Sequence, residues 1–233
     1  MRKIMMLAAM TAATALTTPA MAAGNPEGKI QVKVMGTAVL PDGGIDKIKY
    51  IAPTLGTTLS GMGVTNPDAK ANDNFVPTLA IEYFVNPNVS VETICCFTQH
   101  HVNGAADLAG TNLVNHVLIL PATVTAKYHL PLGPIKPYIG AGPSLYVVFG
   151  EKPGSTARAL GVDKVKLSNS VGLALQGGVD IALGDGGMGL SLDANKYFIK
   201  PTAKFYNAAG AKVLETKHDL DPWVVSAGVS YRF

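Results

Sequence analysis

The run Ile94-Cys95-Cys96-Phe97-Thr98-Gln99-His100-His101 holds two adjacent thiols followed closely by two adjacent imidazoles. Thiolates and imidazoles bind transition metals, and paired thiols carry out redox chemistry. A zinc site normally takes cysteines separated by intervening residues, together with further ligands, and a vicinal disulfide needs a distorted backbone. The backbone element that carries the run therefore decides which of these reactions is open to it.

Segments of alternating apolar and polar residues, separated by turn-forming residues, recur along the chain. We expect eight strands, at residues 29–40, 74–85, 89–100, 116–130, 137–149, 170–183, 188–199 and 222–233. Each is about twelve residues long, which suits a tilted strand that crosses a bilayer with some overhang.

The connections between these strands alternate in length. Short turns are expected at 86–88, 131–136 and 184–187, and long loops at 41–73, 101–115, 150–169 and 200–221. An even number of strands places both chain ends on the side of the short turns. This sorting is typical of bacterial outer-membrane barrels, which have short periplasmic turns and long extracellular loops.

The first residues are typical of a secretory signal peptide. Arg2 and Lys3 precede an apolar stretch, and Ala20-Met21-Ala22 supplies a cleavage pattern. We expect residues 1–22 to be removed and residues 23–233 to form a single barrel domain. No apolar run of eighteen residues follows, although mean hydropathy is +0.24 and only 15% of residues are charged. A secreted, apolar chain without such a run fits a transmembrane β-barrel.

The composition argues against several other classes of protein. The sequence has no basic patch that would indicate binding to nucleic acid. Its two cysteines are too few for a disulfide framework. Successive side chains of a strand face opposite ways, so Cys95 should face outward and Cys96 inward. Because such a pair cannot hold one metal ion, we expect neither a metal site nor a cofactor, and we interpret both cysteines as ordinary strand residues.

Charged residues fall on the face that the alternation predicts to point into the barrel. They are Lys33, Glu82, Glu92, Lys127, Asp180, Asp193 and Arg232. Buried charges are costly unless they are paired, so we expect a network. Such a network either fills and stiffens the barrel or acts as a gate on a transport path. Aromatic residues near strand ends are predicted to form the girdles at the membrane surfaces: Tyr83, Phe84, Tyr128, Tyr138, Trp223 and Tyr231.

Six stretches together resemble the outer membrane protein W family of Gram-negative bacteria. They are "VKVMGTAVLPDGG" (32–44), "NPNVSVE" (86–92), "LPATVTAKYHL" (120–130), "KPYIGAGPSLY" (136–146), "VGLALQGGVDIAL" (171–183) and "LDPWVVSAGVSYRF" (220–233). The resemblance implies an all-β fold, an eight-stranded antiparallel transmembrane β-barrel, with a mostly apolar channel. It implies passage of small hydrophobic molecules across the outer membrane and their exit sideways into the bilayer. The ending Tyr231-Arg232-Phe233 resembles a barrel-assembly signal, carried by Tyr231 and Phe233.

The leading hypothesis is therefore a narrow, porin-like channel in the bacterial outer membrane, with both termini in the periplasm. Its predicted hydrophobic entrance is formed by Ile51, Leu55, Leu59 and Met62, unless these residues merely extend the neighbouring strands. The alternative is a non-transporting structural or adhesive barrel, or a surface receptor that acts through its four long loops. No nucleophile motif accompanies His218, so no enzyme is expected. Expected partners are outer-membrane lipid, lipopolysaccharide, the barrel-assembly machinery and small hydrophobic solutes.

Overall fold

The computed structural model describes residue 25 and residues 27–233. The predicted signal peptide and its cleavage after residue 22 lie outside the described residues. The first half of the described chain comprises β1 (Ile30–Leu40), β2 (Ile45–Ile51), α1 (Pro53–Gly61), β3 (Pro67–Ala71), β4 (Asn74–Asn86), β5 (Val89–Cys95), β6 (Thr98–Ala106) and β7 (Asn112–His129). The second half comprises β8 (Ile135–Pro153), α2 (Ser155–Ala159), β9 (Lys164–Leu167), β10 (Ser170–Ala182), β11 (Met188–Phe198), β12 (Thr202–Tyr206), β13 (Lys212–His218) and β14 (Trp223–Arg232).

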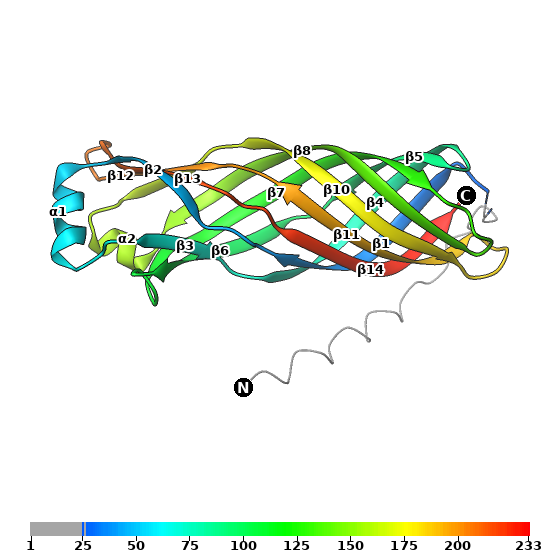
Figure 1. The fold of residues 1–233 in the computed structure, drawn as a ribbon, viewed down its shortest axis with the longest axis horizontal. Coiled ribbons are helices and arrows are strands. Elements are labelled where there is room, and N and C mark those ends of the chain that lie inside the picture. Colours follow the sequence, from blue (N-terminus) through cyan, green and yellow to red (C-terminus); the bar gives the residue numbers. More distant parts are fainter. Residues whose placement is uncertain (1–24, 26) are drawn as a thin grey trace, which may run out of the picture.

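The strands close into an antiparallel barrel in the order β1-β4-β5-β7-β8-β10-β11-β14, and β14 pairs back onto β1 (Figure 1). The closing ladder runs from Gln31 opposite Arg232 to Leu40 opposite Trp223. β6 continues the line of β5 along β7. Each of the eight expected segments corresponds to one position in the barrel wall, so the predicted eight-stranded fold is confirmed.

The short turns lie at one end of the barrel and the long connections at the other, as the alternation of their lengths predicts. The C-terminus lies at the end that carries the short turns, and helix α1 lies at the opposite end (Figure 1). There the long loops build a second, four-stranded sheet in the order β2-β13-β12-β9. Among the described residues, neither helix has the length and apolar character needed to cross a membrane.

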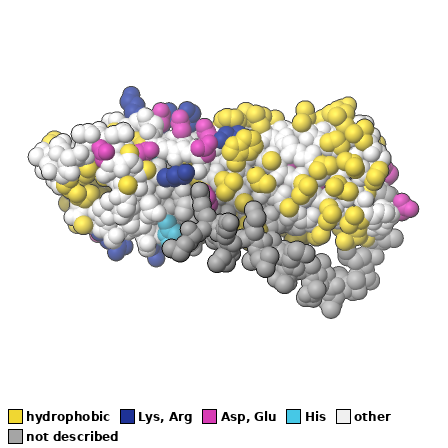
Figure 2. All heavy atoms as spheres, turned by 60° about the horizontal axis from the view of Figure 1, so that its bottom comes forward, with side chains coloured by type: hydrophobic (Ala, Val, Ile, Leu, Met, Phe, Trp, Pro, Cys, Tyr) yellow, Lys and Arg dark blue, Asp and Glu magenta, His cyan; other side chains and the backbone are white. Residues whose placement is uncertain are grey.

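Side chains alternate between the lumen and the outside along most of the wall. On β4, Leu79, Ile81 and Tyr83 are exposed, whereas Ala80 and Glu82 are fully buried in the lumen. Figure 2 shows hydrophobic side chains gathered over the half of the molecule that lies away from the loop sheet. The outward residues include Val34, Leu79, Ile81, Val85, Val91, Val124, Ile139, Val171, Leu173, Leu175, Leu190, Leu192, Val225 and Val229. This apolar belt suits contact with lipid chains, while the loop half projects beyond it.

The predicted long loop at 101–115 is wrong, because most of it is strand. β6 continues to Ala106 and β7 begins at Asn112, so only a tight turn separates them. Val102 pairs with Val114, and Asn103 with Asn112. The polar residues of this stretch interrupt the alternation of apolar and polar residues, so the sequence pattern predicts a loop. A hairpin that projects beyond the lipid can still form there, because it needs no apolar outer face.

The predicted aromatic girdle is wrong for two of its six residues. Phe84 and Tyr138 are each only 3% exposed and point into the lumen. Tyr83, Tyr128 and Trp223 do face outward. Neighbours on a strand face opposite sides, so Tyr83 and Phe84 cannot both join a girdle.

Candidate functional site

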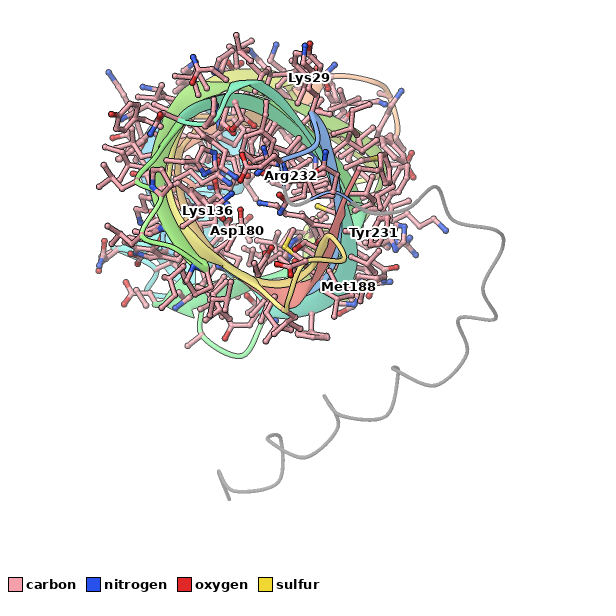
Figure 3. All side chains as sticks on the ribbon, turned by 90° about the vertical axis from the view of Figure 1, so that its right-hand side faces the viewer. Lys29, Lys136, Asp180, Met188, Tyr231 and Arg232 are labelled. Atoms are coloured by element: carbon pink, nitrogen blue, oxygen red, sulfur yellow. The ribbon has the colours of Figure 1, made fainter. Side chains whose placement is uncertain are left out.

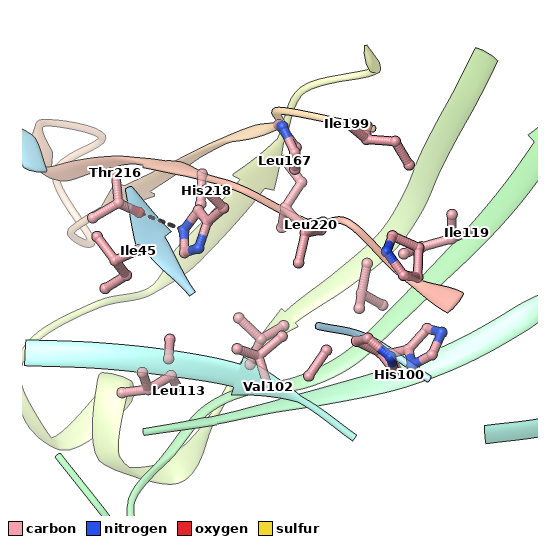
Figure 4. A pocket seen from close by; sticks show the side chains of 18 of the residues that line it. Ile45, His100, Val102, Leu113, Ile119, Leu167, Ile199, Thr216, His218 and Leu220 are labelled. Atoms are coloured by element: carbon pink, nitrogen blue, oxygen red, sulfur yellow. Dashed lines mark hydrogen bonds between the residues drawn. The ribbon is translucent and has the colours of Figure 1, made fainter. Parts of the chain in front are cut away.

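A cavity of about 440 Å³ lies in the loop half of the barrel and is lined by residues of the barrel wall, the second sheet and helix α1. Figure 4 shows part of this lining. The size of the cavity falls in the range of small-molecule sites. Its walls are largely apolar and include Ile48, Val64, Val102, Ile119, Leu167, Ile199, Phe205, Leu214 and Leu220. Because these residues come from the barrel wall and from the loop sheet, the cavity is a joint product of both layers.

Three of the predicted entrance residues, Ile51, Leu55 and Leu59, lie in the cavity lining. Leu55 is the buried residue of α1, a helix that begins with Pro53, whose fixed φ suits a first helical turn. Met62 follows that helix, is 61% exposed and lies outside the lining. β2 pairs with β13, so this segment forms part of the loop sheet instead of extending the first barrel strand.

Below the cavity, buried charges fill the lumen. Lys33 Nζ lies 2.8 Å from Glu82 Oε2, 3.0 Å from Glu92 Oε2 and 3.3 Å from Asp180 Oδ1. Lys127 Nζ lies 3.0 Å from the same Glu82 and Glu92 oxygens. Lys33, Glu82, Glu92 and Lys127 are all 2% exposed or less. Two lysines from β1 and β7 thus bind carboxylates from three further strands and tie the wall together.

Polar neighbours connect Asp193 to this network without a direct ion pair. Gln176 Nε2 donates to Glu92 Oε1 at 2.7 Å and to Asp193 Oδ2 at 2.8 Å. The Tyr138 hydroxyl donates to the same Asp193 oxygen at 2.8 Å, and the Tyr138 ring lies 3.6 Å from Lys127 Nζ. The charges are therefore held by a hydrogen-bonded frame, which is the condition for tolerating charges that are buried.

Arg232, the seventh predicted member, lies apart from the lysine contacts. Its Nε donates to the Gly28 carbonyl at 2.6 Å, and its guanidinium lies 3.6 Å from the centre of the Phe84 ring. Figure 3, which looks into the end of the barrel with the short turns, shows Arg232 and Asp180 at this opening. The rings of Tyr231 and Phe233 lie 5.6 Å apart beside it, and Phe233 N donates to the Ile30 carbonyl. Their predicted part in assembly remains a prediction.

Three members of the network were not among the predicted site residues. Gln176 and His129 lie on the inward faces of their strands. Neither counts among the inward charges predicted from the sequence, because glutamine carries no charge and histidine is counted as neutral at pH 7. His129 Nε2 lies 2.9 Å from Glu82 Oε1. For Tyr138 the sequence predicts a place in the girdle, because it lies near a strand end. The alternation that places Lys127 inward also places His129 inward, and this signal was available in the sequence.

The barrel wall is interrupted beside the cavity. The β4–β5 ladder ends where Leu79 pairs with Cys95, and β4 residues 74–78 have no strand partner in β6 within the described chain. The Asn74 side chain spans this gap, donating from Nδ2 to the Gln99 carbonyl at 2.7 Å. Continuing the registers on each side places Pro77 opposite Phe97 and Pro121 opposite Cys96. Proline has no N–H to donate, which accounts for the break.

The adjacent cysteines and the histidines that follow them are divided between the two faces of this wall. Cys95 is exposed on the outside, Cys96 is buried in the cavity lining, and both are free thiols. His100 also lines the cavity, with Nε2 2.9 Å from Thr98 Oγ1. His218 shares a 2.8 Å hydrogen bond with Thr216, and its burial lowers the pKa of its imidazole (Figure 4).

Comparison with known proteins assigns the chain to a family. The OmpW family model matches residues 26–233. The chain is 30% identical to the outer-membrane protein y4mB of Sinorhizobium fredii, over 93% of this chain and 84% of that protein. It is 29% identical to the dibenzothiophene metabolism operon protein PahQ of Pseudomonas aeruginosa, over 75% of this chain and 79% of that protein.

A solved structure shows the same fold. The outer membrane protein OprG from Pseudomonas aeruginosa superimposes with a TM-score of 0.73 and 24% sequence identity, over 90% of this chain and 98% of OprG. The closed eight-stranded barrel, its apolar belt and the family match agree with one another. This chain therefore belongs to the OmpW family of bacterial outer-membrane β-barrels.

Proposed function

We propose that this barrel is a narrow channel for small hydrophobic molecules, with its loop sheet outside the cell and both termini in the periplasm. The observation that carries the proposal is the position of the apolar cavity. The cavity lies above a lumen closed by buried ion pairs and beside the stretch of wall where β4 and β6 are not paired with each other. Outer-membrane lipid, lipopolysaccharide and the barrel-assembly machinery are its partners in this proposal.

The proposed path begins in the loop half and leaves through the wall. An apolar molecule gains favourable burial in the cavity, at roughly 25 cal/mol per Å² of apolar surface. Moving straight down would require the molecule to separate the buried Lys33 and Lys127 from their carboxylates, which is strongly unfavourable. Moving sideways between β4 and β6 requires no ladder hydrogen bond at residues 74–78 to be broken. The lateral route is therefore the less costly one.

A relative's name is consistent with this class of solute. PahQ is named for an operon of dibenzothiophene metabolism. Dibenzothiophene is an apolar aromatic compound, and the cavity here is lined by apolar side chains such as Ile119, Ile199 and Leu220.

Replacing Leu55 with glutamate is expected to reduce the uptake of naphthalene several-fold in liposomes that carry the refolded protein. The carboxylate would stand in an apolar lining, where water around it competes with the solute. Met62→Glu is the matched control, because Met62 is exposed and lies outside the lining. Equal uptake by the Leu55→Glu and Met62→Glu variants would count against entrance through this cavity.

A further inference from the structure

The loop sheet presents lysines on its outer side. Ile48, Leu167, Phe205 and Leu214, one from each of its four strands, line the cavity. Because successive side chains of a strand face opposite ways, the residues beside them face away from the cavity. Seven lysines lie on this outer side, which we call the lysine face: Lys47 and Lys49 on β2, Lys164 and Lys166 on β9, Lys204 on β12, and Lys212 and Lys217 on β13.

The lysine face has a large excess of positive charge. The four strands contain seven lysines but only two carboxylates, Asp46 and Glu215, which gives a net charge of +5 in a chain whose formal net charge is +3. Glu215 is already shared, because its carboxylate lies 2.6 Å from Lys212 Nζ and 4.0 Å from Lys49 Nζ. The net positive charge of the chain is therefore concentrated on this sheet.

Lysines lie opposite one another across two pairs of strands. Lys204 is directly opposite Lys166, and Lys217 is directly opposite Lys47. Like charges in such cross-strand positions destabilise a sheet. Lys217 has Asp46 at 3.3 Å and Lys166 has Glu151 at 3.8 Å, but Lys204 and Lys47 form no ion pair with any carboxylate of the described chain. An anion from outside the protein would stabilise both pairs.

The height of the lysine face places it at the membrane surface. Phe198 and Trp223 are exposed on the barrel wall just before the loop sheet begins. Thr202, which pairs with Lys217, follows Phe198 by four residues, or about 13 Å of strand at 3.3 Å per residue. Figure 2 shows most charged side chains of that view on the loop half, beyond the apolar belt. The lysines therefore begin in the layer where lipid headgroups lie.

We propose that the lysine face binds the phosphate groups of lipopolysaccharide, the lipid of the outer leaflet. This inference rests on the proposed function, which places the loop sheet outside the cell, and it identifies the surface that contacts one of the proposed partners. Lipopolysaccharide carries phosphate on sugars at the membrane surface, so its anions lie at the height of the lysines. A phosphate between two opposed lysines neutralises the charge that they hold against each other.

Two tyrosines make the lysine face suited to a sugar phosphate. Tyr50 lies opposite Glu215, and Tyr206 lies opposite Lys164, so both are on the outer side of the sheet. Lys212 Nζ lies 5.1 Å from the centre of the Tyr50 ring. Sugar rings pack their C–H groups against aromatic rings, whereas the headgroup of an ordinary anionic phospholipid offers no sugar ring for such packing. The face therefore fits a phosphorylated sugar better than a simple phospholipid.

The test measures binding of fluorescent rough-form lipopolysaccharide to the folded barrel in zwitterionic detergent micelles. Wild-type protein is expected to bind it more tightly than dephosphorylated lipopolysaccharide or phosphatidylglycerol. The double variant Lys47→Gln with Lys204→Gln should bind it roughly tenfold more weakly, because each lysine close to an anionic lipid surface contributes about fivefold in affinity. The variant should fold, since neither lysine has a carboxylate partner to lose.

The matched control is Lys29→Gln with Lys70→Gln, which changes the net charge by the same amount. Both lysines are exposed and lie outside the loop sheet, Lys29 at the end with the short turns (Figure 3) and Lys70 on β3. This control should bind lipopolysaccharide as wild type does. Equal losses in the two double variants, or undiminished binding of dephosphorylated lipopolysaccharide, would overturn the phosphate surface. Equally tight binding of phosphatidylglycerol would overturn its assignment to lipopolysaccharide.

A separate measurement keeps this surface distinct from the channel. In phospholipid liposomes without lipopolysaccharide, the variant Lys47→Gln with Lys204→Gln should take up naphthalene as fast as wild type, because neither lysine lines the cavity. Loss of lipopolysaccharide binding in this variant with normal uptake would support the proposal. Normal lipopolysaccharide binding in the folded variant would overturn the lysine face and leave the channel intact.

Discussion

A disulfide between a cysteine introduced at Thr78 and the native Cys96 is expected to reduce uptake of naphthalene to the level of empty liposomes. The two positions face each other across the end of the β4–β5 ladder, where the Thr78 hydroxyl already lies against the Cys96 thiol. The bond would fix β4 to the β5–β6 strand line, where the wall has no ladder hydrogen bonds. If solutes leave between these strands, the covalent link closes their exit while the apolar cavity above remains.

The same preparation supplies its own control, because reduction of the disulfide should restore uptake. A second control combines Thr78→Cys with Cys96→Ser, which removes the inward partner. Cys95 faces outward and cannot replace it. Uptake that is equal in the oxidised and reduced forms, with the disulfide shown to have formed by mass spectrometry, would exclude exit through this part of the wall.

Replacing Lys33 with methionine is expected to lower the free energy of unfolding by about 3–5 kcal/mol, the usual cost of removing one partner from a buried ion pair. Lys33 is 1% exposed and contacts Glu82, Glu92 and Asp180. Methionine fills much of the same volume, so the loss would come from uncompensated carboxylates and not from a void. Urea titration of the barrel in lipid vesicles measures the change.

Two further variants separate charge from packing in that experiment. Adding Glu92→Gln to Lys33→Met should recover part of the loss, because one unpaired charge is removed. Lys136→Met should cost much less, because the partner of Lys136 is Glu27, whose side chain is 63% exposed. A Lys33→Met barrel within 1 kcal/mol of wild type would show that the network contributes little to stability, and would favour a role as a gate.

The barrel itself could be predicted from local pattern. The strand period of two and the alternation of short turns with long loops are properties of neighbouring residues, and they located every strand of the wall. The same period placed Lys33, Glu82, Glu92, Lys127, Asp180 and Asp193 inward. It could not say which of them touch, because Lys33 and Asp180 are brought together only by the closed barrel.

The cavity could be predicted only in part. Ile51, Leu55 and Leu59 were identified by their apolar character in a long loop, but the lining also needs the pairing of β2 with β13, which lie far apart in the chain. The unpaired wall depends on Pro77 and Pro121 lying on two strands on either side of Cys96 and Phe97. Neither proline alone predicts a gap in the wall. The gap follows only once the register of β4, the β5–β6 line and β7 places both prolines beside the same two residues.

The central claim is that this barrel carries small apolar solutes, and the rate of naphthalene uptake into liposomes tests it most directly. The liposomes contain lipopolysaccharide and the refolded wild-type protein, and glucose serves as the polar comparison. If the barrel is such a channel, naphthalene uptake should be faster than in empty liposomes, without a matching increase for glucose. Naphthalene uptake equal to that of empty liposomes, with the barrel shown to be folded, would contradict the channel and direct attention to the loop sheet as the surface of a receptor or adhesive protein.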